Sequence, residues 1–227
     1  MSKCLFIAGT ATDVGKTFIS ALVVKCLRNA GLNAGYYKAA ASGVDIDANG
    51  KLIGGDPIYV NDFANIGENS ENLVSYIYSQ PVSPHLAARI NDKPIDFAVI
   101  RNDFNRAKNK YDYLVVEGSG GVICPLRWDN KYHLMLLDIV RAFKLPILLV
   151  AGSGLGTINS TILTVDYLHR NELTPKALIF NHFREETMEI DNIQMIEEMA
   201  NIPVIAKVKF GDKRLDVDVE VLKNLFA

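Results

Sequence analysis

The chain has 227 residues, 49% of them hydrophobic and 22% charged, which is the composition of a globular protein and excludes a disordered or fibrous one. Its 24 lysines and arginines against 26 acidic residues leave a formal charge of −2, so we expect no nucleic-acid partner. An anionic ligand must then be held by the local geometry of its site rather than by the net charge of the protein. The length predicts a single domain over 1–227.

The sequence also predicts a cytoplasmic protein without a membrane segment. The three cysteines, Cys4, Cys26 and Cys124, are odd in number and widely spaced, which disfavours a disulfide framework or a cysteine zinc site. No apolar run approaches the roughly 20 residues of a membrane span, and 5–8 is too short for the core of a signal peptide. We therefore expect reduced thiols in a cytoplasmic protein.

Short apolar strands alternate with amphipathic helices along the chain. In chain order the pattern predicts a strand at 4–8, a helix at 16–30, a strand at 34–38, helices at 57–66, 83–91 and 95–108, a strand at 113–117, a helix at 133–143, a strand at 146–151, a helix at 158–170, a strand at 177–181, a helix at 186–201, a strand at 203–206 and a final helix within 216–226. The polar stretch 39–56 is long for a loop in a compact domain, and loops of that length are usually functional or mobile.

Apolar strands separated by helices imply a mostly parallel central sheet covered on both faces, which is a three-layer α/β/α fold. Right-handed crossovers place the carboxyl ends of all the strands along one edge of that sheet. Ligands of open α/β sheets bind beyond this edge.

The strongest motif is the segment 9–17, Gly-Thr-Ala-Thr-Asp-Val-Gly-Lys-Thr, between the first strand and the first helix. Backbone N–H groups of such a loop attract phosphate oxygens, Lys16 would reach the β- and γ-phosphates, and the Thr17 hydroxyl would bind Mg²⁺. Gly9 lies six residues before Gly15, where the strict pattern has five. The motif predicts a fold of the P-loop NTPase type, with a tight strand-to-helix turn as the alternative.

Two acidic residues are candidate metal partners. Glu117 ends a buried strand, at the ligand edge of the sheet, and the glycines of 118–121 would let the backbone approach a ligand closely. The alternative is a strand-end glutamate that faces water. Asp56 follows two glycines in the polar stretch and is a weak candidate by itself, because aspartate after glycine is common in turns.

Lys38 closes the second strand at the same edge and is placed to stabilise charge on a phosphorylated intermediate. A lysine whose head simply reaches water is an equal alternative. The segment 154–157 opens a helix and is a second candidate anion site. His85 has no spaced ligand partner, so we interpret it as structural rather than metal-binding.

Taken together, the motifs resemble those of the dethiobiotin synthetase family, in order and over about four-fifths of the chain. The motifs are Gly9-Thr10-x-Thr12-Asp13-Val14-Gly15-Lys16-Thr17, Tyr37-Lys38-x-x-x-Ser42-Gly43, Gln80-Pro81-x-Ser83-Pro84-His85, Val115-Val116-Glu117-Gly118-x-Gly120-Gly121 and Leu155-Gly156-x-Ile158-Asn159. The resemblance implies an ATP-dependent ligase that joins CO₂ to 7,8-diaminononanoate with Mg²⁺. The implied reaction proceeds through a carbamic–phosphoric anhydride and closes the ureido ring of the biotin precursor. The resemblance also implies a homodimer.

The resemblance further implies roles for individual residues. Lys38 and Lys16 would act in catalysis, and Thr17, Asp56 and Glu117 would bind the metal. ATP would be bound by Thr12, Asp13, Val14, Gly15, Lys16, Thr17, Phe18, Asp56, Glu117, Gly118, Ser119, Gly120 and, at the adenine, Asn181. The other substrate would be contacted by Ser42, Gly156, Thr157, Ile158 and Asn159.

One segment departs from the family pattern, and one rival class shares the motif. The segment 206–211 differs from a Gly-x-x-Pro-like segment of the family, and His182 stands where we expect an acid. The rival is a P-loop ATPase switch of the partition or division-site type. Such switches carry an additional lysine where this chain has Ala11, and the acidic tail 216–220 also differs from their basic membrane-binding helix.

Overall fold

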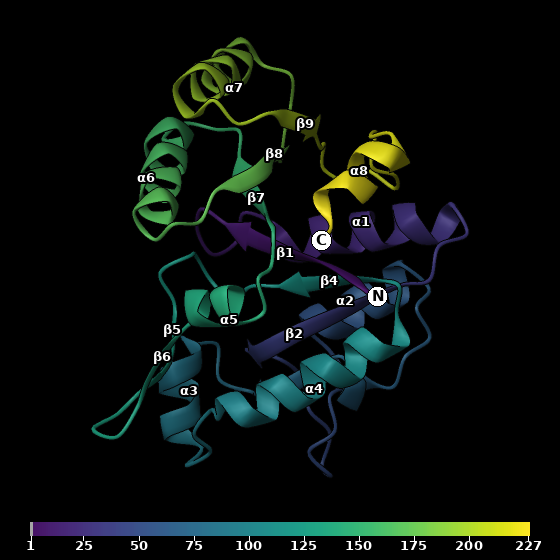
Figure 1. Ribbon diagram of the computed structural model, residues 1–227, viewed down its shortest axis with the longest axis vertical. Helices are drawn as coiled ribbons and strands as arrows, with labels where there is room; N and C mark the ends of the chain where they lie inside the picture. The colour runs from purple at the N-terminus through teal and green to yellow at the C-terminus, as the bar shows by residue number, and fades with distance from the viewer. Residues whose placement is uncertain (1) are drawn as a thin grey trace.

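Seven parallel strands form a central sheet in the order β3-β2-β4-β1-β7-β8-β9 in the computed structural model, which describes residues 2–227 (Figure 1). The strands of this sheet are β1 (Lys3–Gly9), β2 (Ala34–Ser42), β3 (Val74–Tyr78), β4 (Tyr113–Glu117), β7 (Ile147–Gly152), β8 (Pro175–Asn181) and β9 (Val204–Lys207). A separate antiparallel hairpin, β5 (Pro125–Trp128) and β6 (His133–Met135), projects from the body of the molecule.

Eight helices lie between and after these strands in the described part of the chain. They are α1 (Lys16–Asn29), α2 (Asp56–Phe63), α3 (Pro84–Ile90), α4 (Phe97–Lys110), α5 (Leu136–Ala142), α6 (Thr157–Arg170), α7 (Thr187–Ala200) and α8 (Val219–Leu225), with one 3₁₀ turn at Ser70–Asn72. Within residues 2–227, no helix has both the length and the apolar character needed to cross a bilayer. The three-layer α/β/α arrangement with a mostly parallel sheet is confirmed.

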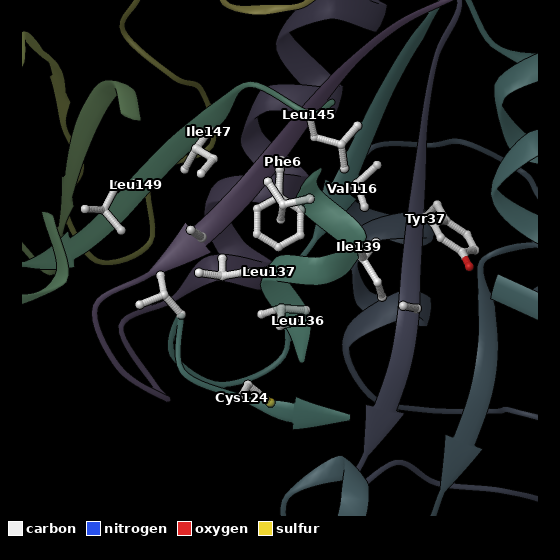
Figure 2. Packing of buried hydrophobic residues seen from close by; sticks show 14 of the residues in the cluster. Phe6, Tyr37, Val116, Cys124, Leu136, Leu137, Ile139, Leu145, Ile147 and Leu149 are labelled. Carbon is white, nitrogen blue, oxygen red and sulfur yellow. The ribbon is translucent and has the colours of Figure 1, made fainter. Parts of the chain in front are cut away.

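Successive side chains of β1 point to opposite faces of the sheet, so the core forms two clusters. Leu5 and Ile7 pack on the face covered by α1, α2 and α8, whereas Cys4, Phe6 and Ala8 pack on the face covered by α3 to α7. Figure 2 shows the second cluster, in which the Phe6 ring lies among side chains of β4 and α5. Because both faces are buried, the strands are apolar throughout, as expected for a parallel sheet.

The structure corrects the sequence prediction at three places. Strand β2 extends to Ser42, so 39–42 belongs to the sheet and not to the polar loop. Strand β3 and the β5–β6 hairpin were not predicted, and 133–135, expected to be helical, is the strand β6. All three depend on pairing with distant segments: β2 gains its last residues by pairing with β3, and β6 exists by pairing with β5. Periodicity within one segment does not report such pairing.

A buried carboxylate fixes the connection that leads into β3. The Glu68 side chain is 4% exposed and accepts hydrogen bonds from Lys110 Nζ at 2.5 Å, Tyr111 OH at 2.7 Å and Asn72 Nδ2 at 3.0 Å. Burial alone would raise the pKa of Glu68, but these donors outweigh it and lower the pKa from 4.5 to about 2. The end of α4 is thereby tied to the loop between α2 and β3.

We predict that Glu68→Gln lowers the free energy of unfolding by about 2 kcal/mol at pH 7, after allowance for the exposed Lys110 partner. Because the folded pKa is depressed, the contribution of Glu68 is complete above its unfolded pKa and is lost as the pH falls from about 4.5 toward 2. Urea denaturation at pH 7 and at pH 3 measures both effects.

The difference between wild type and Glu68→Gln is expected to shrink at pH 3. The exposed neighbour Glu71 provides the control, and Glu71→Gln should change stability by less than about 0.5 kcal/mol. An equal loss in both variants, or a Glu68→Gln effect that is independent of pH, would contradict the assignment.

Candidate functional site

The loop between β1 and α1 is built around two glycines. Gly15 has φ +89, in the left-handed region, and a Cβ at this position would collide with the amide nitrogen of Asn181 at the end of β8. A Cβ on Gly9 would lie 2.9 Å from side-chain atoms of Lys16 and Val14. The loop therefore closes tightly on itself and on β8, and its free N–H groups lie at the N-terminus of α1.

A cleft of about 1060 Å³ opens beside this loop, beyond the carboxyl ends of β2 and β4. Most of the residues expected from the sequence line it together. They are Thr12, Asp13, Gly15, Lys16, Thr17, Phe18, Lys38, Ser42, Asp56, Glu117, Ser119 and Gly120. The cleft thus joins the phosphate loop to the ends of two strands that are distant in the sequence.

The charged centre of the cleft is the ammonium group of Lys38. Its Nζ lies 2.5 Å from Asp56 Oδ2 and 2.6 Å from Glu117 Oε1. The pairing follows from the sheet register, because Lys38 of β2 stands directly opposite Glu117 of β4. Asp56 reaches the same point from the first residue of α2.

Burial and charge oppose each other at this centre. Burial would lower the pKa of Lys38, but the carboxylates of Glu117 and Asp56 outweigh it, and the pKa of Lys38 is raised. Burial would raise the pKa of Asp56, but the Lys38 ammonium group lowers it. Lys38 therefore stays protonated and Asp56 ionised at neutral pH, so Lys38 is a fixed positive charge and not a base.

Lys16 is the second lysine of the cleft and stands at the start of α1. Its Nζ donates to the Ala11 carbonyl at 2.9 Å, so the side chain folds over the loop. Burial lowers the pKa of Lys16, and the Lys38 charge adds to that effect, while Glu117 and Asp56 oppose it. Lys38 is thus paired directly with the two carboxylates, whereas Lys16 feels their charge from a distance.

Three oxygen-bearing side chains at this centre suit a magnesium ion. Thr17 Oγ1 donates to Glu117 Oε1 at 3.0 Å, and Glu117 and Asp56 both lie within 2.6 Å of one ammonium nitrogen. Hydroxyl and carboxylate oxygens are the ligands that Mg²⁺ prefers, with water and phosphate completing the shell. Within 2–227, no group of three or more His, Cys, Asp or Glu side chains is arranged to hold a metal ion.

The remaining expected residues do not line the cleft. Val14 packs against Gly9 on the inner side of the loop, and a Cβ on Gly118 would lie 2.8 Å from the Phe6 ring, so this glycine permits close packing of β1 and β4. The group Gly156, Thr157, Ile158 and Asn159 lies at the start of α6, after β7. Thr157 Oγ1 donates to the Gly152 carbonyl there, which fixes the turn into the helix.

Asn181 lies behind the phosphate loop at the end of β8. Its Nδ2 donates to the Val14 carbonyl at 3.1 Å, and the side chain is fully buried. Within the described residues, its Oδ1 has no hydrogen-bond partner. Asn181 thus supports the loop through one side-chain atom and keeps a second polar atom free.

Several lining residues were missed as site residues. The cleft is also lined by Tyr59 of α2, by Ile123 and Cys124 between β4 and β5, and by 81–84 between β3 and α3. Burial raises the pKa of the Cys124 thiol to about 11, so it is a packed thiol and not a nucleophile. Only 81–84 had a sequence signal, in the Pro-x-Ser-Pro-His motif. Ser83 Oγ and His85 Nδ1 of that motif lie 3.0 Å apart, which agrees with a structural histidine.

Comparison with known proteins identifies the family. A family model described as an AAA domain matches residues 3–213. Two Clostridium botulinum proteins, from strains Alaska E43 and Eklund 17B, are each 46% identical over 227 residues, which cover 100% of this chain and 99% of each relative. Both are named ATP-dependent dethiobiotin synthetase BioD. The chain belongs to the dethiobiotin synthetase family.

The rival switch class shares the fold with this family. A ParA family ATPase from Chlorobium tepidum has a TM-score of 0.55 at 12% identity, over 92% of this chain and 84% of that one. At that identity the likeness concerns the fold alone. Members of the dethiobiotin synthetase family are ATP-dependent ligases, and the cleft with its phosphate loop accords with ATP as substrate.

We predict that Gly15→Ala weakens ADP binding at least 100-fold in calorimetry, because its Cβ forces Asn181 or the loop to move. Gly31→Ala is a matched control. Gly31 has φ +79, close to that of Gly15, but a Cβ added there would meet no atom of a non-adjacent residue within 4 Å. Gly31→Ala should lower the free energy of unfolding by about 1–2 kcal/mol through backbone strain and leave ADP affinity unchanged. Normal ADP binding by Gly15→Ala would show that the contact with Asn181 does not shape the loop.

Proposed function

We propose that the protein is an ATP-dependent dethiobiotin synthase, which joins CO₂ to 7,8-diaminononanoate and closes the ureido ring of the biotin precursor. The observation that carries the proposal is the Lys38 ammonium group between Asp56 and Glu117, in a phosphate-loop cleft. The chain that holds this cleft is 46% identical, over its full length, to proteins named dethiobiotin synthetases.

The reaction needs a leaving group because a carbamate is a poor electrophile. One amine of the substrate captures CO₂ as a carbamate. A carbamate oxygen then attacks the γ-phosphorus of ATP, the bond to ADP breaks, and a carbamic–phosphoric anhydride forms. The second amine attacks the carbonyl carbon, phosphate leaves, and the ring closes. The last step is intramolecular, so the site mainly positions groups and stabilises charge.

The residues of the cleft have the chemistry for these steps. The loop N–H groups and Lys16 would bind the phosphates, and Lys38, which stays protonated, would stabilise the negative charge of the carbamate and of the departing phosphate. Ser42, at the end of β2, lines the same cleft and would contact the substrate. Catalysis by Lys38 would be electrostatic.

Mg²⁺ would be held by Asp56 and Glu117, whose carboxylates meet at the Lys38 ammonium group, and by Thr17, whose hydroxyl donates to Glu117. When bound, such an ion neutralises the charge that develops on the phosphate oxygens. Thr17 and Glu117 already share a hydrogen bond, so the protein holds part of the ligand set in place.

Asn181 is the candidate for adenine. Its buried Oδ1 has no partner within 2–227 and can accept a hydrogen bond from an exocyclic amino group. Its Nδ2 remains engaged by the Val14 carbonyl, so the base would be positioned relative to the phosphate loop.

We further propose a cytoplasmic, single-domain enzyme that acts as a homodimer. A single seven-stranded sheet takes strands from both halves of the described chain, from β1 to β9, and all three cysteines are free thiols. The residues 156–159 lie outside the cleft of their own chain, next to Leu155, which is 91% exposed. In the proposed dimer, this segment would contact the substrate bound in the cleft of the second copy.

Phosphate release is the direct test of this function. Purified protein with bicarbonate and MgATP should release phosphate only when 7,8-diaminononanoate is added, and mass spectrometry should detect dethiobiotin. Phosphate release at the same rate without the diamine would contradict the synthase and favour an ATPase switch.

In the same assay, Lys38→Met should lower the diamine-dependent rate about 100-fold or more, because the charge that stabilises the anionic intermediate is lost. Lys25→Met is the control, since Lys25 of α1 lies over the Phe63 ring of α2 and outside the cleft. If Lys38→Met keeps more than about a tenth of the rate, the activation barrier has changed by less than about 1.4 kcal/mol. Lys38 would then not be a catalytic residue.

A further inference from the structure

The two oxygens of the Glu117 carboxylate have different donors. Oε1 accepts hydrogen bonds from Thr17 Oγ1 and Lys38 Nζ, on the side that faces the cleft. Among residues 2–227, Oε2 accepts one hydrogen bond, from the Tyr36 hydroxyl, at 3.0 Å. Tyr36 is fully buried and Glu117 is 1% exposed, so water does not replace this bond.

Strand geometry explains how Tyr36 reaches Glu117. Tyr36 and Lys38 are two residues apart on β2 and therefore point to the same face of the sheet. Tyr36 stands opposite Val115, and Lys38 stands opposite Glu117, on the neighbouring strand β4. Glu117 is thus held from the cleft side by Lys38 and from the core side by Tyr36.

The bond has a fixed direction. The Tyr36 hydroxyl donates and Glu117 Oε2 accepts, because a carboxylate oxygen is an acceptor. The terminal torsion of a glutamate is broad, so the carboxylate plane is free to rotate unless both oxygens are held. A donor at Oε2 sets that plane and keeps Oε1 directed toward Thr17.

We propose that Tyr36 is a positioning residue, which orients the Glu117 carboxylate for a divalent cation bound together with the nucleotide. The inference rests on the proposed Mg²⁺ site and adds a residue that does not touch the ligand. Groups that orient metal ligands in this way commonly change metal affinity by 10- to 100-fold when they are removed.

The chain supplies a matched control in the next residue. Tyr37 is also fully buried on β2, and its hydroxyl is also hydrogen-bonded, to Ser75 at 2.7 Å and to the Ile100 carbonyl at 3.2 Å. It points to the opposite face of the sheet, away from Glu117. Tyr37→Phe therefore removes the same kind of buried hydroxyl without touching the carboxylate.

The test is the effect of Mg²⁺ on ADP binding, measured by calorimetry in excess Mg²⁺ and in EDTA with the full-length protein. The ratio of the two dissociation constants reports the coupling between ion and nucleotide. We expect Tyr36→Phe to reduce this ratio about tenfold and to change the affinity in EDTA less than about twofold. We expect Tyr37→Phe to keep the wild-type ratio.

A wild-type ratio in Tyr36→Phe, or an equal loss in Tyr37→Phe, would overturn the inference while leaving the proposed Mg²⁺ site in place. The absence of any Mg²⁺ effect in the wild type would overturn both. If Tyr36→Phe unfolds without ligand, the Mg²⁺ concentration for half-maximal diamine-dependent phosphate release at saturating ATP becomes the readout. A rise of about tenfold would then support the inference, and an unchanged value would overturn it.

Discussion

The ammonium group of Lys38 pairs with two carboxylates at the edge of the sheet, and the arrangement of the cleft depends on that contact. Lys38 is 4% exposed and Glu117 is 1% exposed, so each charge would be costly to bury without the other. Asp56, at the start of α2, brings a second carboxylate to the same nitrogen. One positive charge thus fixes the end of β2, the end of β4 and the start of α2 relative to one another.

The parallel sheet and the phosphate loop turn this contact into a site for phosphate chemistry. Register places Lys38 opposite Glu117, and the loop from Gly9 to Gly15 brings Thr17 within 3.0 Å of the same carboxylate. The cleft therefore combines N–H groups and lysines for anions with oxygens for a cation. A reaction that passes charge from a carbamate to a phosphate needs both kinds of group close together.

Sequence reasoning succeeded where the signal is local and failed where it depends on pairing. The Gly-Lys-Thr motif and Glu117 at a strand end were identified because each stands next to a recognisable apolar strand. Strand β3, the β5–β6 hairpin and the end of β2 were missed, since distant segments create them. Tyr36 was seen only as part of a core strand. Alternation predicts that it shares a face with Lys38, but only the register with β4 shows that its hydroxyl reaches Glu117.

The most direct test of the account is a crystal structure with ADP and Mn²⁺, in which anomalous scattering locates the ion. The account predicts one ion at about 2.0–2.1 Å from Thr17 Oγ1, the distance typical of Mg²⁺. Asp56 or Glu117 would bind the same ion, either directly or through an ordered water. The diphosphate would lie in the loop that Gly15 opens. An ion bound elsewhere, with Asp56 and Glu117 both still paired only with Lys38, would contradict it.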